Sequence, residues 1–79
     1  MSDLPLCSSR DVIRALARAG FRPARRAKGS HEAWVRDRAD GGKNVTIVVL
    51  GRRGIVRTTL RDIVEKAGLT EDEFISYLR

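Results

Sequence analysis

The sequence holds very few of the residues that build disulfides and metal sites. It contains one cysteine, Cys7, and one histidine, His31. A single cysteine excludes an intrachain disulfide, and one cysteine and one histidine far apart argue against a structural metal site. No CxxC, GxGxxG or P-loop pattern occurs. We therefore expect neither a metal nor a cofactor, and we interpret Cys7 as a small hydrophobic residue.

Long hydrophobic runs are missing as well. No stretch approaches the ~20 apolar residues of a membrane span, and residues 1–7 lack the hydrophobic region of a signal peptide. Apolar residues make up 42% of the chain and charged residues 33%, which is enough apolar surface for one small core. We expect one domain over residues 1–79, located in the cytoplasm and not associated with a membrane.

Acidic residues are the scarcer charged type. Lys and Arg number 16 against 10 Asp and Glu, which gives a net charge of +6. Residues 1–57 carry thirteen basic and five acidic side chains, a net +8, whereas residues 58–79 carry three basic and five acidic, a net −2. A basic body with a mildly acidic end predicts a polyanionic partner such as a nucleic acid.

Helical spacing predicts a first helix that begins at Ser8 or Ser9 and ends at Gly20. Four residues form its apolar face: Val12, Ile13, Leu16 and Ala17. Three arginines follow another side at i, i+4 and i+8: Arg10, Arg14 and Arg18. This stripe suits phosphate binding or an ordinary solvated face.

The C-terminal part of the sequence predicts two further helices. Thr58 or Thr59 would cap the first of them, and Gly68 would end it. We expect its buried face to be Leu60, Ile63, Val64 and Ala67, with Arg61 and Glu65 as an exposed i, i+4 pair. The segment 70–73 reads as a capping box that opens a short last helix. That helix would turn three residues inward: Phe74, Ile75 and Leu78.

Three strands are expected between these helices. Residues 21–28 form the weakest, an edge strand because Pro23 cannot donate to a ladder. Residues 31–36 form the second, with Trp34 most simply explained as a core residue. A hairpin signal at 40–43 leads to residues 44–50, apolar on both faces and predicted to be the best-buried strand. Helices on one face of a three-stranded antiparallel sheet make an α+β fold.

The segment Lys28-Gly29-Ser30-His31 is the strongest candidate for a site. An imidazole has an ordinary pKa of about 6.5, which suits it to accept a proton near neutral pH. The lysine and the backbone N–H groups of the two small residues suit a phosphate. Three nearby arginines would anchor flanking phosphates: Arg22, Arg25 and Arg26. The pair 52–53, between two glycines, forms either a flexible phosphate-binding loop or a solvated turn.

The chain resembles the HicA family of small toxins from bacterial toxin–antitoxin pairs. Three segments carry the resemblance, in the family's order and spacing: Ala19-Gly20-Phe21, Lys28-Gly29-Ser30-His31, and Thr59-Leu60-Arg61 through Ala67-Gly68-Leu69. The resemblance implies a double-stranded-RNA-binding-domain-like α-β-β-β-α fold with a short C-terminal helix. It also implies a ribonuclease that cleaves mRNA, with His31 as catalytic residue and a cognate HicB-type antitoxin as inhibitor.

The sequence departs from the family pattern in one respect. Family members often end the third strand in a Pro-Val-His-like run, whereas this chain reads Ile47-Val48-Val49-Leu50-Gly51 and has no second histidine. The proton donor is then Lys28, water or the same imidazole. Two other classes of function fit the features: a non-catalytic double-stranded-RNA-binding module, and a domain whose basic face binds an acidic protein.

Overall fold

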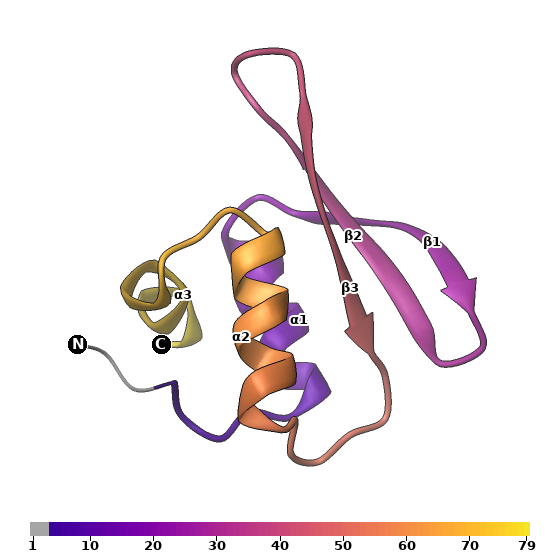
Figure 1. Cartoon of the computed structure of the whole chain (residues 1–79), viewed down its shortest axis with the longest axis vertical. Helices are drawn as coiled ribbons and strands as arrows, with labels where there is room; N and C mark the ends of the chain where they lie inside the picture. Colours follow the sequence, from indigo (N-terminus) through magenta and orange to yellow (C-terminus); the bar gives the residue numbers. More distant parts are fainter. Residues whose placement is uncertain (1–3) are drawn as a thin grey trace.

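The computed structural model describes residues 4–79 and, for residues 25–28, the backbone but not the side chains. The elements follow the order helix, three strands, helix, helix (Figure 1). Their bounds are α1 Ser9–Arg18, β1 Arg22–Lys28, β2 His31–Asp37, β3 Lys43–Val49, α2 Arg57–Lys66 and α3 Glu71–Leu78. This order, with its antiparallel sheet, confirms the predicted α+β fold.

The three strands form one antiparallel sheet in the order β1-β2-β3, so β1 and β3 are its edges. Pro23 lies in β1, and the pairing of β1 with β2 slips on either side of Arg26, as expected of an edge strand that contains proline. The β2–β3 pairing is regular from His31 opposite Val49 to Asp37 opposite Lys43. Beyond the helices, the far end of this hairpin projects away from the body (Figure 1).

One face of the sheet packs on the helices and forms the core. Thr46 and Val48 of β3 are both 0% exposed, and Trp34, the cross-strand partner of Thr46, is 6% exposed. The hydroxyl of Thr46 donates to the carbonyl of Ile63 in α2 at 2.9 Å, which ties the sheet to that helix. Trp34 is therefore a core residue, as predicted.

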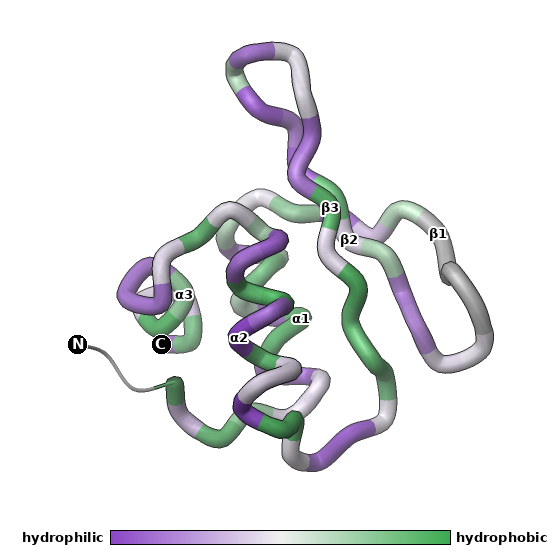
Figure 2. The backbone as a smooth tube through the Cα atoms, in the orientation of Figure 1, coloured by the Kyte–Doolittle hydropathy of each residue, from purple (hydrophilic) through white to green (hydrophobic). Residues whose placement is uncertain are grey.

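The opposite face of the sheet carries no helix. Val45 and Ile47 alternate with the two buried residues of β3 and are 47% and 38% exposed. The prediction that this strand is buried on both faces was wrong, because α1 and α2 both lie on the same side of it (Figure 1). Figure 2 shows that the lower part of β3 consists of hydrophobic residues. Val35, also on this face, is 7% exposed but lies outside the core cluster.

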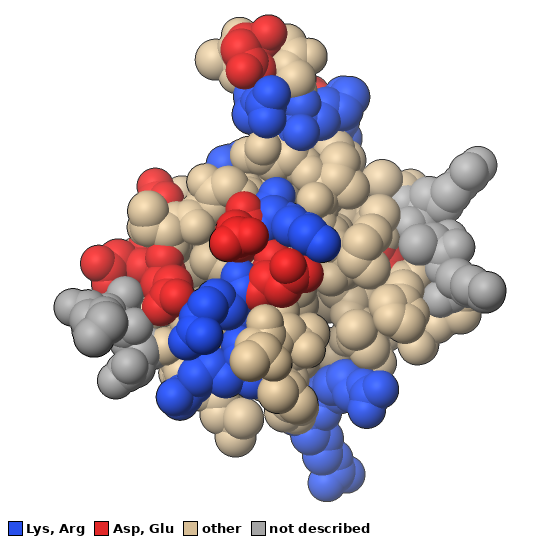
Figure 3. Space-filling model, in the orientation of Figure 1, with Lys and Arg blue, Asp and Glu red and all other residues tan. Residues whose placement is uncertain are grey.

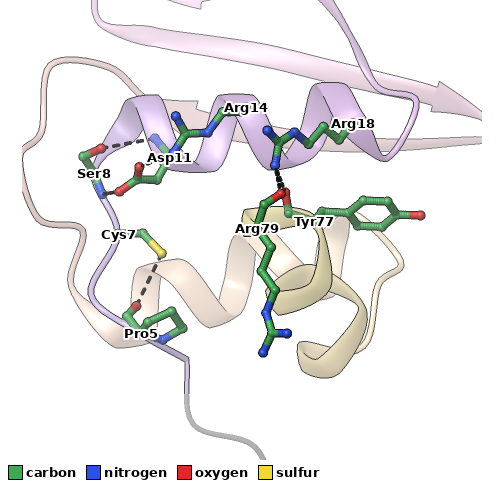
Figure 4. Close-up of polar contacts among 8 residues, drawn as sticks. All are labelled: Pro5, Cys7, Ser8, Asp11, Arg14, Arg18, Tyr77 and Arg79. Carbon is green, nitrogen blue, oxygen red and sulfur yellow. Dashed lines mark hydrogen bonds and ion pairs between the residues drawn. The ribbon is translucent and has the colours of Figure 1, made fainter.

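Helices α1 and α3 both begin with a capping box. Ser8 accepts from the N–H of Asp11 at 3.1 Å, and the Asp11 carboxylate accepts from the N–H of Ser8 at 3.0 Å (Figure 4). Thr70 and Glu73 repeat the arrangement at the start of α3. Ser8 was one of the two caps expected for α1, and the capping box of α3 is confirmed.

Helix α2 begins differently from the prediction. Its N-cap is Val56, whose side chain cannot cap, and Thr58 and Thr59 lie inside the first turn rather than before it. The helix starts early because the preceding residue, Ile55, is 4% exposed and its N–H donates to the carbonyl of Cys7 at 2.7 Å. This hydrogen bond anchors the chain two residues before Arg57, the first residue of α2.

Several charged side chains have structural partners. Arg14 pairs with Asp11, and the guanidinium of Arg18 donates to the carbonyls of Tyr77 and Arg79, which joins α1 to α3 (Figure 4). Arg61 does not pair with Glu65 as expected. It pairs with Glu71 of α3 at 3.3 Å, and the i, i+4 pair of α2 is Asp62 with Lys66. Two arginines of the predicted stripe, Arg14 and Arg18, thus already have partners within the protein.

Cys7 is 1% exposed and belongs to the core cluster. Its thiol lies 3.4 Å from the carbonyl of Pro5 (Figure 4). Burial raises the pKa of the Cys7 thiol above its ordinary value, with the nearby Asp11 charge adding to the effect, so the reactive thiolate is disfavoured. Cys7 is the small hydrophobic residue that the sequence predicts.

Candidate functional site on the open face of the sheet

His31 is the first residue of β2 and is exposed. Its cross-strand partner in β3 is Val49, and its partner in β1 is Lys28. Side chains alternate along a strand, so His31 shares its face with Ala33 and Val35, and its neighbour Glu32 points to the opposite face. Glu32 indeed accepts from the indole N–H of Trp34 at 3.0 Å. The imidazole therefore lies at one end of the face that no helix covers.

A two-residue turn delivers His31 to this position. Gly29 has a φ of +54°, and no non-glycine residue of the described chain has a positive φ. Glycine in the first central position followed by a residue with ordinary φ is the pattern of a type II′ hairpin turn. The turn is held to the end of β3, because the N–H of Leu50 donates to the carbonyl of Ser30 at 2.7 Å. Gly29 and Ser30 are both exposed beside His31.

The predicted basic residues do not all gather at His31. Arg22 starts β1 opposite Val35, four residues along β2 from His31, which is about 13 Å at 3.3 Å per residue. It lies 3.6 Å from Asp37. A hydrogen bond and charge from Lys43, followed by the charge of Arg22, hold the pKa of Asp37 below its ordinary value. Arg22 thus belongs to an ion-pair cluster at the far end of the face.

The other predicted cations lie in β1 at positions whose side chains fall outside the described part of the structure: Arg25, Arg26 and Lys28. Their backbone places them in the edge strand beside β2, with Arg26 opposite Glu32 and Lys28 opposite His31. Lys28 is thus the backbone neighbour of the imidazole across the hairpin.

The loop after β3, predicted to be either a flexible phosphate-binding loop or a solvated turn, is hydrogen-bonded to the start of α1. Ser9, 4% exposed at the start of α1, holds it by three hydrogen bonds. The Ser9 hydroxyl donates to the carbonyl of Val49 at 2.6 Å and accepts from the N–H of Arg52 at 3.0 Å. The Ser9 N–H donates to the carbonyl of Arg52 at 2.9 Å. These bonds tie Val49, at the end of β3, and Arg52, in the loop, to the start of α1.

A cavity of about 210 Å³ opens between the end of β3, this loop and the start of α2. Six residues line it: Val49, Arg52, Gly54, Ile55, Val56 and Thr59. Lys and Arg side chains gather in the region where Figure 1 places the loop between β3 and α2 (Figure 3). The cavity thus has a largely apolar lining to which Arg52 adds a guanidinium, and it shares Val49 with the surroundings of His31.

The described residues hold no group of three or more His, Cys, Asp or Glu side chains that could bind a metal ion. Among the side chains that the structure describes (residues 4–24 and 29–79), none forms a hydrogen bond or ion pair with the imidazole of His31. The arrangement offers an exposed imidazole, an adjoining glycine turn and a nearby cavity. Imidazole is the side chain best suited to proton transfer near neutral pH.

Sequence reasoning missed two residues of this site. Ser9 was read only as a possible helix cap, although its burial and its bonds to the loop after β3 are what fix the cavity wall. Val49 was read as part of a fully buried strand. No local pattern reveals that it faces His31, because the β2–β3 register depends on the length of the projecting hairpin.

The comparison with protein-family models decides the family. The model described as HicA toxin of bacterial toxin–antitoxin matches residues 9–69, from the first residue of α1 to just beyond α2. The chain belongs to the HicA toxin family. This HicA toxin is therefore one half of a toxin–antitoxin system, and an antitoxin partner is implied. No curated protein matches the chain in a direct search.

The match includes the whole sheet, the turn before His31 and the cavity, and it ends before α3. The helix α3 is thus an addition to the matched region and packs mainly on α1. None of the helices in the described part of this HicA toxin is long and apolar enough to cross a lipid bilayer.

Proposed function

We propose that this HicA toxin is a metal-independent endoribonuclease that cleaves mRNA, with His31 as its catalytic residue. The observation that supports this most strongly is the placement of His31, exposed at the start of β2 on the face that no helix covers. The sequence supplies only one imidazole, and the fold presents it to solvent beside a glycine turn. A core histidine would instead be buried and bonded to neighbours.

The proposed reaction needs no group beyond the RNA and the protein. The imidazole of His31 removes the proton of a ribose 2′-OH, and that oxygen attacks the adjacent phosphorus. The bond from phosphorus to the 5′-oxygen breaks, which leaves a 2′,3′-cyclic phosphate on one product and a 5′-hydroxyl on the other. The departing oxygen takes its proton from water, from Lys28 or from the imidazolium itself.

The remaining RNA contacts come from the segment around His31. In this proposal, the ammonium of Lys28 and the backbone N–H groups of Gly29 and Ser30 stabilise the charge that develops on the phosphate. Arg25 and Arg26 anchor neighbouring phosphates along β1. Arg22 contacts a more distant phosphate, because Val35, opposite it, is about 13 Å from His31 along the strand.

We propose further that the antitoxin is of the HicB type and that both proteins work in the cytoplasm. The basic excess of residues 1–57 would steer both the RNA and an acidic antitoxin to the same region. An antitoxin that covers His31 would then block RNA by direct competition.

The test is induced expression of the toxin with and without the neighbouring gene, followed by cleavage of RNA by the purified protein. We expect wild-type protein to arrest growth and to cut RNA equally well with and without EDTA. His31→Ala should lower the cleavage rate by about 100-fold or more, the range of general acid–base catalysis. Cleavage by His31→Ala at the wild-type rate would refute the assignment, and RNA binding without cleavage by the wild type would favour the binding-module alternative.

A further inference from the structure

We propose that the cavity between β3 and α2 binds the base of one unpaired RNA nucleotide next to the phosphate at which His31 promotes cleavage. The inference rests on the proposed ribonuclease function and deepens it, because it defines the substrate as single-stranded at that position. Four observations carry it: the cavity's size, its lining, its exposed apolar rim and its link to His31.

The size of the cavity suits one planar ring system. Its volume is about 210 Å³, below the roughly 300–1,000 Å³ of pockets that enclose a whole drug-sized ligand. A single base can enter such a space while its ribose and phosphate remain outside. A stacked or paired base cannot, since its faces are already covered.

The lining matches the two chemical parts of a nucleotide. Val49, Ile55 and Val56 offer apolar contact to the faces of a base, and the hydroxyl of Thr59 can both donate to and accept from its edge. Arg52 adds a guanidinium that can stack on a base or bind the phosphate. Arg52 is exposed, and among residues 4–79 no carboxylate forms an ion pair with it.

Two exposed apolar side chains lie at or near the cavity. Val56, which lines it, is 69% exposed, and Leu6 is 81% exposed. Leu6 packs beside the loop, because a side chain added at Gly54 would meet its Cδ1 at 3.3 Å. The other exposed large hydrophobic residues of the described chain are Val45 and Ile47, on the open face of the sheet. Soluble proteins rarely expose such groups together unless a ligand or partner covers them.

The link to His31 is the cross-strand pair that it forms with Val49. Directly opposed residues on one face have Cβ atoms about 4.5–5.5 Å apart, so the cavity begins one side chain away from the imidazole. Three hydrogen bonds from Ser9 fix this wall. A base held there would place its own ribose and phosphate beside His31.

The matched pair Thr59→Phe and Thr58→Phe tests the site. Both threonines are exposed in the first turn of α2, but only Thr59 lines the cavity. The phenyl ring of Thr59→Phe fills the space, whereas that of Thr58→Phe lies outside it. A second pair tests the charge of the lining. Arg52→Gln removes one positive charge from the lining of the cavity, and Arg53→Gln removes one from the next residue of the loop, which does not line it.

The probes are the four nucleoside 5′-monophosphates, with ribose 5-phosphate and inorganic phosphate as baseless controls, titrated into the full-length protein and followed by amide NMR shifts. We expect at least one nucleotide to shift the amides of residues 52–59 with at least tenfold higher affinity than either control. Thr59→Phe should abolish this binding, Thr58→Phe should leave it within twofold, and Arg52→Gln should weaken it more than Arg53→Gln.

Equal shifts with inorganic phosphate, or nucleotide shifts that Thr59→Phe leaves intact, would overturn the inference. So would cleavage of fully paired RNA at the single-stranded rate. These results are separate from the test of His31. Nucleotide binding at the cavity without RNA cleavage would refute the ribonuclease but leave the base site. Cleavage without nucleotide binding would refute the base site but leave the ribonuclease.

Discussion

The two faces of the three-stranded sheet differ in burial: one packs on the helices and the other is exposed. On one face, Thr46 and Val48 are fully buried under the helices; on the other, Val45 and Ile47 are substantially exposed. Both sets of residues alternate along one strand, β3. Of the four consecutive β-forming residues 45–48, two thus pack in the core and two lie on the exposed face, at one end of which His31 lies. The comparison teaches that apolar character in a short strand does not by itself identify the core.

Substitutions in β3 give the largest expected effect on stability and the sharpest test of this division. Val48→Ala should lower the free energy of unfolding by about 2–3 kcal/mol, because it opens a cavity in the core. Val45→Ala, the same change three residues away on the exposed face, should alter it by less than about 0.5 kcal/mol. Urea denaturation followed by circular dichroism measures both. Equal losses would show that the second face is covered in solution.

The hydrogen bond between the sheet and α2 should contribute a smaller amount. Thr46→Val keeps the side-chain shape and removes the donor to the Ile63 carbonyl, so we expect a loss of about 1 kcal/mol in unfolding free energy. Thr46→Ser, which keeps the hydroxyl, is the control for that donor. A Thr46→Val variant as stable as the wild type would mean that the hydrogen bond does not stabilise the fold.

Substitutions at the capped start of α1 and the uncapped start of α2 should differ in stability by a similar amount, about 1 kcal/mol. Ser8→Ala removes half of the capping box of α1 and should cost about 1 kcal/mol. Thr58→Ala, in the first turn of α2 where no side chain caps, should change stability by less than about 0.5 kcal/mol. Thermal unfolding of the two variants separates these expectations. If Thr58→Ala costs as much as Ser8→Ala, a threonine does cap α2 after all.

The pH dependence of the α1 cap is the smallest effect. Hydrogen bonds from the backbone and side chain of Ser8 lower the pKa of Asp11 below its ordinary value. Its contribution to stability is therefore complete above the unfolded pKa of about 3.9 and is lost as the pH falls through the lower, folded pKa. Asp11→Asn should be less stable than wild type at pH 7, and the gap should close in acid. A gap that does not depend on pH would contradict this linkage.

Much of the fold could be predicted because its signals are local. The capping box of α3 and the glycines after α1 and α2 lie next to the helix ends that they determine. The projecting hairpin is predicted by the turn-forming residues at its own tip. The prediction for β3 failed because coverage of a strand depends on where distant helices pack. The start of α2 was misplaced because a contact with Cys7, nearly fifty residues earlier, sets it.

The candidate site divides in the same way. His31 could be selected because it is the only imidazole and follows two small residues, Gly29 and Ser30. Its neighbours could not: Val49 reaches it through the strand register, and Ser9 fixes the cavity wall through bonds to residues more than forty positions away. Arg22, close to His31 in sequence, lies toward the other end of the face.

The central claim is that the open face of the sheet performs the chemistry and the covered face maintains the fold. The most direct measurement compares His31→Ala with Val45→Ala, its companion on the same face, in both RNA cleavage rate and unfolding free energy. We predict that His31→Ala loses cleavage by about 100-fold or more while its stability stays within about 0.5 kcal/mol of wild type, and that Val45→Ala keeps more than a tenth of the rate. Undiminished cleavage by a stably folded His31→Ala would contradict the account.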